Sequence, residues 1–373
     1  MSRMKLKDIA VEKKERVENP SQSPYSIFVG LEHYDSGEAT IRRYGSTERL
    51  ESTMKAFHAG DILVARRNVY LKRAATVDFD GLTSGDSIVL HIENEDFRRI
   101  IPFVLNTDDF WNYANQHADG SMSKRLSPKL LMEYEFSLPD DNLEQVSNIL
   151  WAMERTKTAY RDLIAKTDEL VKSQFIEMFD EINGAEYCPL EKCCKSITGG
   201  NTPSMQHPEY YGGSIPFIKS GDVKEHRVSQ GSLCLTELAL RKTTAKIIPA
   251  GSVLVVIRSA ALRHQFHTAI AQVPLVINQD LKALQAKTEF LPEYLMWALI
   301  AHEERLLGGV QTVLTSHIEM KDLLSLPIMI ASLAKQKQFC QFVEQCDKSK
   351  FAAQQTLNEL TDAQKALMKK IFE

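Results

Sequence analysis

The feature that most constrains the fold of this chain is an internal repeat, because segments of its first half return about 190 residues later. Residues 59–64 read Ala-Gly-Asp-Ile-Leu-Val, and residues 250–255 read Ala-Gly-Ser-Val-Leu-Val. An arginine follows each segment within three residues, at Arg66 or Arg67 in the first copy and at Arg258 in the second.

Further segments return in the same order at nearly the same offset: residues 27–29 as 216–218, 120–121 as 309–310, and 137–139 as 325–327. Each copy opens with short β-type runs separated by turn signals, for example residues 59–61 in the first copy and residues 199–203 and 249–251 in the second. Because several matches share one order, the chain is expected to contain two copies of one mixed α/β module.

A long helix is predicted after each module. Residues 143–182 contain neither glycine nor proline, and apolar side chains recur close to a three-four spacing. The positions are Val146, Leu150, Met153, Tyr160, Ile164, Thr167, Val171 and Met178, and in the C-terminal segment Phe339, Val343, Cys346, Leu357, Leu360, Leu367 and Ile371. One helix does not bury such a stripe alone, so the two are expected to pair antiparallel as a coiled coil. The alternative is that each helix packs only on its own module.

These patterns together predict an α+β fold, with two pseudo-symmetric mixed α/β domains separated by two long antiparallel helices. The expected segments are a first domain at residues 1–142, a central helix at 143–183, a second domain at 184–332 and a C-terminal helix at 333–373.

Composition and charge narrow the class of protein. No apolar run reaches the roughly 18 residues that a membrane helix requires, and the charged N-terminus lacks the apolar core of a signal peptide, so a cytoplasmic protein is expected. The net charge of −4 does not suggest a nucleic-acid binder. However, residues 41–75 hold eight Lys or Arg against three Asp or Glu, and residues 195–270 hold nine against four. These basic segments favour local attraction for phosphates, although chance clustering on a solvated face is the alternative.

No catalytic centre is predicted from motifs. The chain lacks a phosphate loop ending in Gly-Lys-Ser/Thr, a Gly-x-Ser-x-Gly elbow, and the Asn-Pro-Pro-aromatic motif of adenine methyltransferases. The cysteines cluster only at Cys188, Cys193 and Cys194, without a second ligand pair, so no metal site is expected. Glu209 with Asp222 and Lys224 follows the acidic-x-Lys pattern of metal-dependent nucleases, which keeps that function as one alternative. A coiled-coil scaffold that does not bind DNA is another.

An ordered set of motifs resembles the target-recognition domains of type I restriction–modification specificity subunits. The set starts at residues 198–204 and 209–222, continues through 251–254 with Arg258, 277–280 and 293–295, and ends at 326–328 before 335–339. The first half carries a weaker version at 59–64, 120–121 and 138–139, so the resemblance covers essentially the whole chain.

Three departures from the family's pattern bear on DNA contacts and leave the architecture unaffected. The first half lacks the glycine- and proline-containing opening, and Gly309-Val310 stands where Gly-Ser or Gly-Thr is usual. Residues 331–334 replace the common second proline and glutamate.

The resemblance implies a non-catalytic subunit that binds double-stranded DNA. Each domain would read one half of a split site, and the long helices would set the spacing and dock two methyltransferase subunits. Those partners would use S-adenosylmethionine to methylate adenine N6. DNA-translocating restriction subunits, which use ATP and Mg²⁺, would complete the enzyme. The chain itself would carry no cofactor and contact no membrane.

DNA-contact candidates follow from the chemistry of the side chains, since Lys, Arg and hydroxyls bind phosphates while Arg, Asn, Gln, Asp and Thr read base edges. In residues 198–204, glycines would let backbone amides approach a phosphate, although a plain turn is the alternative. The candidates in the second module are Ser196, Thr198, Asn201, Thr202, Lys219, Asp222, Arg227, Arg241, Lys242 and Arg258. Those in the first module are Arg42, Arg43, Tyr44, Arg66, Arg67, Lys72, Arg73, Lys124 and Arg125.

Overall fold

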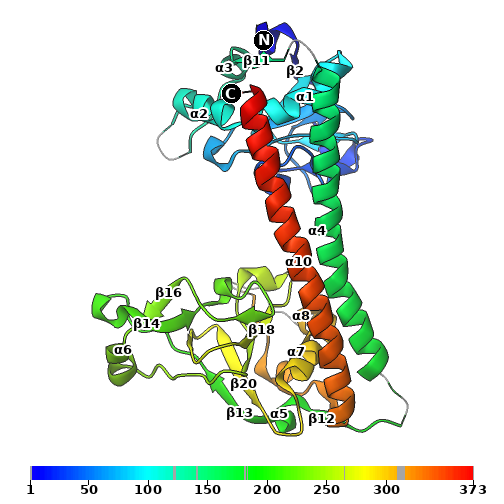
Figure 1. Cartoon of the computed structure of the whole chain (residues 1–373). Coiled ribbons are helices and arrows are strands. Elements are labelled where there is room, and N and C mark those ends of the chain that lie inside the picture. The colour runs from blue at the N-terminus through cyan, green and yellow to red at the C-terminus, as the bar shows by residue number, and fades with distance from the viewer. Residues whose placement is uncertain are drawn as a thin grey trace. The chain divides into compact units, whose positions relative to one another are not determined.

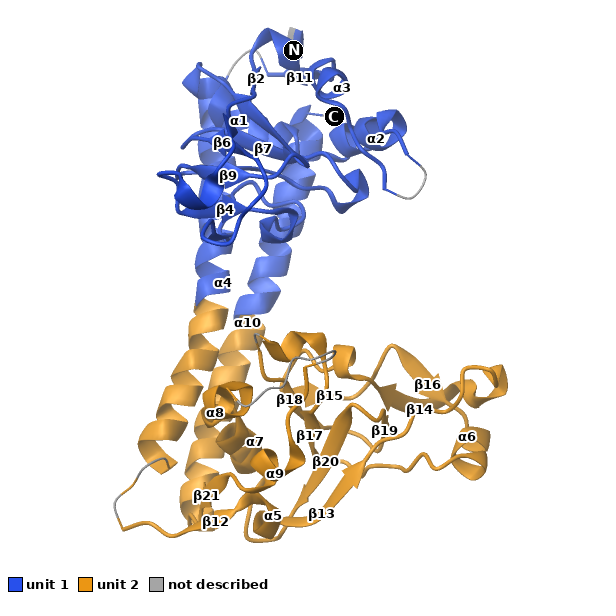
Figure 2. Ribbon diagram, turned by 180° about the vertical axis from the view of Figure 1, so that it is seen from behind, with its two compact units in different colours: residues 1–162, 353–373 blue, residues 163–352 orange. Residues whose placement is uncertain are grey.

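The computed structural model describes residues 2–120, 123–139, 142–179, 182, 184–263, 265–308 and 316–372. The chain divides into two compact units, and Figure 2 colours them separately. Unit 1 contains residues 1–162 and 353–373, and unit 2 contains residues 163–352. Each long helix thus contributes one segment to each unit, and the segment boundaries expected at residues 142, 183 and 332 stay predictions.

Unit 1 is built on two small sheets. The first has the order β2 (Val11–Lys13), β10 (Ser87–His91), β7 (Ile62–Ala65), β8 (Ala74–Thr76). The second has the order β3 (Arg16–Val17), β6 (Met54–Phe57), β9 (Gly81–Thr83), β4 (Ile27–Val29), β5 (Gly45–Ser46), and β1 (Ser2–Lys5) pairs separately with β11 (Glu135–Leu138). The helices are α1 (Glu95–Val104), α2 (Asp108–His117) and α3 (Pro128–Met132), with the 3₁₀ turns η1 (Leu6–Asp8), η2 (Pro20–Gln22), η3 (Leu31–His33) and η4 (Val69–Leu71).

Unit 2 repeats this plan. Its larger sheet has the order β13 (Cys194–Gly199), β20 (Leu281–Ala286), β17 (Val253–Val256), β18 (Thr268–Ala271), β15 (Arg227–Val228). A smaller sheet has the order β16 (Leu233–Leu235), β14 (Tyr211–Ile218), β19 (Val276–Ile277), and β12 (Tyr187–Pro189) pairs with β21 (Pro327–Met329). The helices are α5 (Leu190–Cys193), α6 (Glu237–Lys242), α7 (Pro292–Ala301), α8 (Glu303–Gly308) and α9 (Met320–Leu324), with η5 (Pro208–Tyr210), η6 (Ser220–Asp222) and η7 (Ala260–Arg263).

The repeated segments found in the sequence occupy equivalent places in the two units. β7 and β17 lie inside their sheets, and each follows a turn whose glycine, Gly60 or Gly251, has a positive φ of 89° or 80°. Only glycine adopts this conformation without strain, which explains the repeated Ala-Gly. β4 pairs in parallel with β9, as β14 does with β19. The matched pieces at Ser121, Gly309 and Val310 lie outside the described residues.

β7 is apolar at four successive positions because both of its faces are covered. Ile62 and Val64 pack into the core formed with α1 and α2, whereas Leu63 and Ala65 pack into a second core with β4 and β6. β17 is divided in the same way, with Val253 on one side and Leu254 on the other. An uninterrupted apolar run is typical of such a doubly buried strand. The α+β architecture predicted from the repeat is confirmed.

The two long helices are α4 (Leu143–Phe179) and α10 (Leu333–Phe372), and they lie side by side (Figure 1). In unit 1 the Lys157 Nζ donates to Gln364 Oε1 at 2.8 Å. In unit 2 the Lys350 Nζ contacts Asp168 at 2.7 Å, and Lys335 Nζ donates to the Met178 carbonyl at 2.7 Å. Positions therefore rise along α4 as they fall along α10, so the helices are antiparallel, and they pack on each other as well as on their modules.

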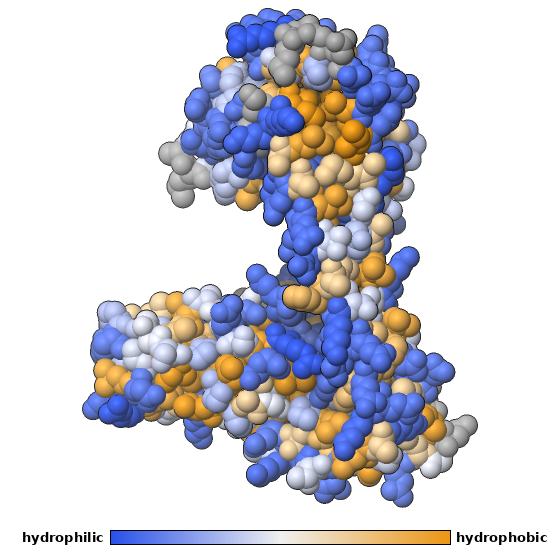
Figure 3. All heavy atoms as spheres, viewed as in Figure 1, coloured by the Kyte–Doolittle hydropathy of each residue, from blue (hydrophilic) through white to orange (hydrophobic). Residues whose placement is uncertain are grey.

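The apolar stripe is only part of the surface that the helices bury. Leu150, Val171 and Phe339 are buried as the spacing predicts. Hydrophobic atoms also gather on unit 1 beside the start of α4 and the end of α10 (Figure 3), where Leu143 and Ile371 join the core. The spacing did not predict the buried polar residues of this region. Within the described ranges, no helix combines the length and hydropathy needed to cross a membrane.

Candidate nucleic-acid interface

The turn that follows β7 in unit 1 and the turn that follows β17 in unit 2 both carry arginine; β7 and β17 are called the central strands. In unit 1 the Asn68 amide donates to the Lys124 carbonyl at 2.8 Å, and the Leu126 amide donates to the Arg66 carbonyl at 2.8 Å. This crossing pairs Arg67 with Arg125 as an isolated bridge. We call residues 66–73 with 123–126 the unit 1 turn.

Unit 2 has the same crossing. The Ser259 amide donates to the Ser316 carbonyl at 3.1 Å, and the Ile318 amide donates to the Ile257 carbonyl at 2.9 Å. Arg258 is thereby bridged to His317, as Arg67 is to Arg125. Residues 257–263 with 316–318 are called the unit 2 turn. Two arginines predicted from the sequence repeat, Arg67 and Arg258, therefore stand at equivalent positions.

The unit 1 turn has more positive than negative charge. Arg67 Nη1 lies 3.4 Å from Asp86 Oδ2, and Arg125 Nη2 lies 3.3 Å from Asp86 Oδ1. The two guanidinium groups thus share one carboxylate. Lys124 Nζ donates to the Asn115 carbonyl at 3.0 Å, a contact that leaves its charge uncompensated. Such a local excess attracts phosphates even in a chain of negative net charge.

Three other predicted residues of this turn are engaged within the fold. Lys72 forms an ion pair with Asp108. The guanidinium of Arg73 donates to the Leu31 carbonyl at 2.9 Å and to the Arg67 carbonyl at 3.0 Å, so Arg73 braces the turn. Arg66 is half-buried, and its Nε has no hydrogen-bond partner among the described atoms.

Residues 42–44 lie in a neighbouring loop of unit 1. Arg43 Nη2 is 2.8 Å from Asp35, and Arg42 Nη2 is 4.0 Å from Glu38. Tyr44 is 56% exposed and meets the Phe79 ring edge-on at 5.3 Å between centroids. Arg42 and Tyr44 line a cavity of about 510 Å³ whose wall also includes Thr40, Ile41, Asp78, Phe79, Trp151, Glu154, Arg155 and Thr158.

The glycine-rich run of unit 2 packs on its own sheet. A Cβ on Gly200 would lie 2.1 Å from the Asn278 carbonyl oxygen, so only glycine fits there. The Asn201 amide donates to the Ile277 carbonyl at 3.1 Å, and its side chain bonds Thr244. These contacts agree with the alternative of a plain turn, because the Asn201 amide already has a partner. A phosphate contact at this run stays a prediction.

The remaining small side chains of this region have partners on the neighbouring segments. Ser196 Oγ donates to Gln285 Oε1 at 3.1 Å, and Thr202 bonds Gln279. Thr198 pairs with Ala283 across β13 and β20. Arg241 and Lys242 are exposed in the last turn of α6, and Lys219 is half-buried at the start of η6.

The carboxylate of Asp222 is used to hold a turn. It accepts the backbone amide of Lys219 at 2.9 Å and that of Ser232 at 3.2 Å. Both oxygens are therefore engaged, which weakens the nuclease alternative, since that alternative needs Asp222 as a metal ligand. In the part of the chain that the structure describes, no group of three or more His, Cys, Asp or Glu residues is arranged to hold a metal ion.

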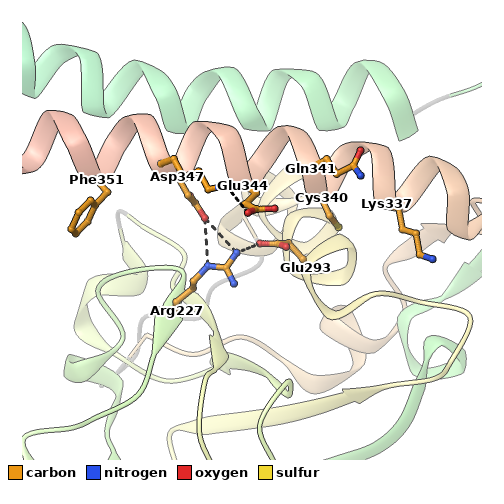
Figure 4. A pocket seen from close by; sticks show the side chains of 9 residues that line it. Arg227, Glu293, Lys337, Cys340, Gln341, Glu344, Asp347 and Phe351 are labelled. Atoms are coloured by element: carbon orange, nitrogen blue, oxygen red, sulfur yellow. Dashed lines mark hydrogen bonds and ion pairs between the residues drawn. The ribbon is translucent and has the colours of Figure 1, made fainter.

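Arg227 lies in a cavity of about 830 Å³ along α10, whose lining includes acidic and basic side chains in equal number (Figure 4). Its guanidinium contacts Glu293 of α7 and, at 3.4 Å, Asp347 of α10. Burial raises the pKa of Glu293, while Arg227 lowers it. Both carboxylates point toward the guanidinium, so this predicted DNA contact has a structural use inside unit 2.

Two residues of the unit 2 turn were missed in the sequence. Arg263 is exposed at the end of η7 and donates from Nε to Ser316 Oγ at 3.3 Å, which places it where unit 1 has Lys72. His317 stands opposite Arg258. Extending the repeat alignment beyond Arg258 would have found Arg263. His317 stands where unit 1 has Arg125, and it was not chosen because histidine was not among the residue types considered for DNA contact.

Comparisons with known proteins identify the kind of domain in the second half of the chain. Residues 186–362 match the family described as "Type I restriction modification DNA specificity domain". The specificity subunit of the Escherichia coli type I restriction enzyme EcoR124I/EcoR124II is 28% identical over 152 residues, or 40% of this chain and 38% of that protein. The MjaIX specificity subunit of Methanocaldococcus jannaschii is 33% identical over 104 residues, or 27% of this chain and 23% of that protein. The chain thus aligns with less than half the length of either relative.

Solved structures show the same fold over the whole chain. One is a chain of a type I R-M system studied for complex assembly and conformational transition, with a TM-score of 0.52 at 20% identity. The match covers 99% of this chain and 97% of that chain. Another is the type I S subunit from M. genitalium, with a TM-score of 0.51 at 13% identity. That match covers 100% of this chain and 96% of that chain. Residues 186–362 thus match a type I restriction modification DNA specificity domain, and the relatives that the chain resembles are specificity subunits of type I restriction enzymes.

Proposed function

We propose that this chain selects the DNA target of a type I restriction–modification enzyme, with one half of a split site read by each unit. The observation that carries the proposal is the pair of equivalent turns, in which Arg67 and Arg258 follow the central strands β7 and β17. An arginine at the end of a rigid strand suits bidentate contact with guanine in the major groove.

The proposal includes partner subunits. Type I relatives are subunits by name, and α4 exposes apolar side chains within unit 2, where Leu163 is 51%, Leu170 53% and Ile176 40% exposed. An apolar row on an otherwise charged helix supports docking of a methyltransferase subunit there. Restriction subunits would join the assembly. S-adenosylmethionine would bind the methyltransferase, and ATP and Mg²⁺ the restriction subunit.

The proposal is tested by reconstitution. Methylome sequencing of the host with and without the gene identifies the target, and the purified chain is then assayed with its methyltransferase partner on that target. Adenine methylation of a split site is expected for the complex and none for the chain alone. Methyl transfer by the isolated chain would contradict the proposal.

The same preparations separate the two alternatives. Mg²⁺-dependent cleavage of DNA by the isolated chain, abolished by Asp222→Ala, would favour a nuclease. A complex that assembles but binds no DNA would favour a scaffold. Specific DNA binding that weakens steeply as salt is raised would favour target recognition, because counterions are released when phosphates are bound.

A further inference from the structure

The η4 turn of unit 1 presents two apolar side chains to solvent. Tyr70 is 60% exposed and Leu71 38% exposed, whereas the preceding Val69 is buried at 1% and anchors the turn in the core. Tyr70 was not among the predicted DNA contacts, because an aromatic residue beside Val69 and Leu71 looks like part of a core segment in the sequence.

The turn is held rigidly from both ends. Asn68 and Lys72 have positive φ angles of 55° and 49°, which residues other than glycine adopt infrequently. The Lys72 amide donates to the Val69 carbonyl at 3.0 Å, and the Gly37 amide donates to the Lys72 carbonyl at 2.9 Å. Ser123 Oγ donates to Asn68 Oδ1 at 3.1 Å. A strained backbone that so many contacts hold in place is often found at functional sites.

Cationic side chains lie on the same unit 1 turn as the exposed ring. Arg67 and Arg125 share Asp86, and Lys124 is exposed on the segment that crosses the turn. A polyanion can meet these cations with its phosphates. The same partner can meet the apolar ring with a nucleotide, because every base and sugar offers an apolar face. The combination of a rigid aromatic tip and flanking cations fits DNA.

Unit 2 lacks this tip at the equivalent turn. Because Arg258 is equivalent to Arg67, the position three residues later is Ala261, which corresponds to Tyr70. The next residue, Leu262, is fully buried, whereas its counterpart Leu71 is exposed. The apolar tip is therefore a property of unit 1 and not of the shared fold.

We propose that Tyr70 is a further specificity-determining residue, whose ring packs on a nucleotide of the half-site read by unit 1 while Arg67 and Arg125 bind nearby phosphates or bases. This inference rests on the proposed function. The ring makes the contact and the hydroxyl is dispensable, since no hydrogen bond from the hydroxyl is required for stacking.

The test measures the affinity of the complete chain, in complex with its methyltransferase partner, for a fluorescent duplex bearing the identified site. Tyr70→Ala is expected to weaken binding by between about 5-fold and 150-fold at fixed salt, the range found for lost base–aromatic contacts. Tyr70→Phe should stay within about twofold of the unsubstituted chain, because the ring is retained. The thermal unfolding midpoint should not change, because Tyr70 is exposed.

Salt dependence and a reciprocal variant sharpen the result. Tyr70→Ala should leave the slope of affinity against salt unchanged, whereas loss of a phosphate-binding cation at Lys124 or Arg125 lowers it by about one. Ala261→Tyr, at the matched turn of unit 2, should change only the preference for the other half-site. Equal affinity of Tyr70→Ala and the unsubstituted complex would overturn the inference while leaving the proposed function intact. Failure of the unsubstituted complex to prefer its site would instead overturn the proposed function.

Discussion

In unit 1 the paired segments of α4 and α10 bury a lysine between them, whereas in unit 2 the corresponding segments bury phenylalanines. Lys157 is 1% exposed, and its Nζ lies 2.9 Å from Glu154 and 2.8 Å from Gln364. In unit 2 the Phe175 and Phe339 rings meet at 5.2 Å between centroids, and the Phe179 ring lies 4.9 Å from that of Tyr294. The same two helices thus pair through two kinds of chemistry.

The polar cluster of unit 1 reaches beyond the helices. Glu38, from the loop that also carries Arg42 and Arg43, lies 3.5 Å from Lys157 Nζ and contacts Arg161. Burial raises the pKa of Glu38, and the neighbouring Glu154 raises it further, while Lys157 and Arg161 oppose the shift. The pKa of Glu154 is lowered although burial opposes this, because Lys157 favours its charged form.

The difference teaches that apolar contacts and buried ions specify different things. Phenylalanine rings stabilise a pairing by the area they bury, and they tolerate small shifts. A buried lysine has to meet its partners at one alignment of the helices, because an unpaired charge in the interior is costly. We expect the cluster to fix both the register of this pairing and the position of the loop at residues 38–43.

The largest expected effect comes from removing the lysine. Lys157→Met leaves Glu154 and Gln364 buried without their partner, so the free energy of unfolding should fall by about 3–5 kcal/mol. Urea unfolding combined with hydrogen exchange of the α4 amides measures this. Lys166→Met, at an exposed position of the same helix, is the control and should change stability by less than about 0.5 kcal/mol.

A repaired variant distinguishes register from stability. Replacing Glu154, Lys157 and Gln364 together by Leu, Met and Leu gives unit 1 an apolar pairing like that of unit 2. Most of the lost stability should return, because apolar groups replace buried ions at little net cost. If Lys157→Met were no more destabilising than Lys166→Met, the buried lysine would not contribute to the stability of the helix pairing in unit 1.

The next effect concerns the shared turns. Arg67→Ala and Arg258→Ala should each weaken DNA binding by about 1–3 kcal/mol if the arginine makes a bidentate base contact. The losses should fall on different half-sites, which binding to duplexes altered in one half at a time would reveal. Losses on the same half-site would show that the two units are not equivalent readers.

The smallest expected effect is a pH dependence of stability that arises in unit 2. Burial lowers the pKa of His226, in unit 2, below its ordinary value of 6.5, although Asp168 opposes the shift. A lowered pKa means that the folded state favours the neutral ring, so this stability is present above about pH 6.5 and is lost as the pH falls.

Unfolding of the chain at pH 7.5 and pH 5.5 measures this loss. His226→Phe should reduce the pH dependence, because the ring that packs at 4.9 Å from Trp297 is kept without its titration. His117→Phe, at an exposed position of unit 1, is the matched control and should leave the dependence unchanged. Equal behaviour of the two variants would remove His226 as the cause.

Much of the fold could be predicted because the repeat and the helical periodicity report on local, apolar patterns. The run at residues 59–64 belongs to the repeat that indicated two mixed α/β modules, and the three-four spacing indicated the paired helices. Lys157 and Glu154 could not be predicted, because a charge pair three residues apart on a helix looks like solvated surface. The burial of this pair depends on contacts with Glu38 and Gln364, which are distant from it in the sequence.

The candidate site was predicted by residue type more than by geometry. Arg67 and Arg258 were found through the repeat and stand at equivalent positions. Arg227 and Asp222 were chosen for their chemistry, and the motifs did not indicate that Arg227 contacts Asp347 or that Asp222 accepts the amide of Ser232. Tyr70 was not chosen, because exposure depends on the φ angles of Asn68 and Lys72, which the sequence does not disclose.

The double burial of β7 and β17 has a consequence for how such a protein changes its DNA target over time. Because Leu63 and Val64 belong to different cores, a substitution in the strand disturbs packing on both sides at once. The turn that follows meets solvent through Tyr70 in unit 1 and through Ala261 in unit 2. Changes of target preference during evolution are therefore expected at residues 66–73 and 257–263. Substitutions there alter the surface that meets DNA, while the sequence of the preceding strand is retained.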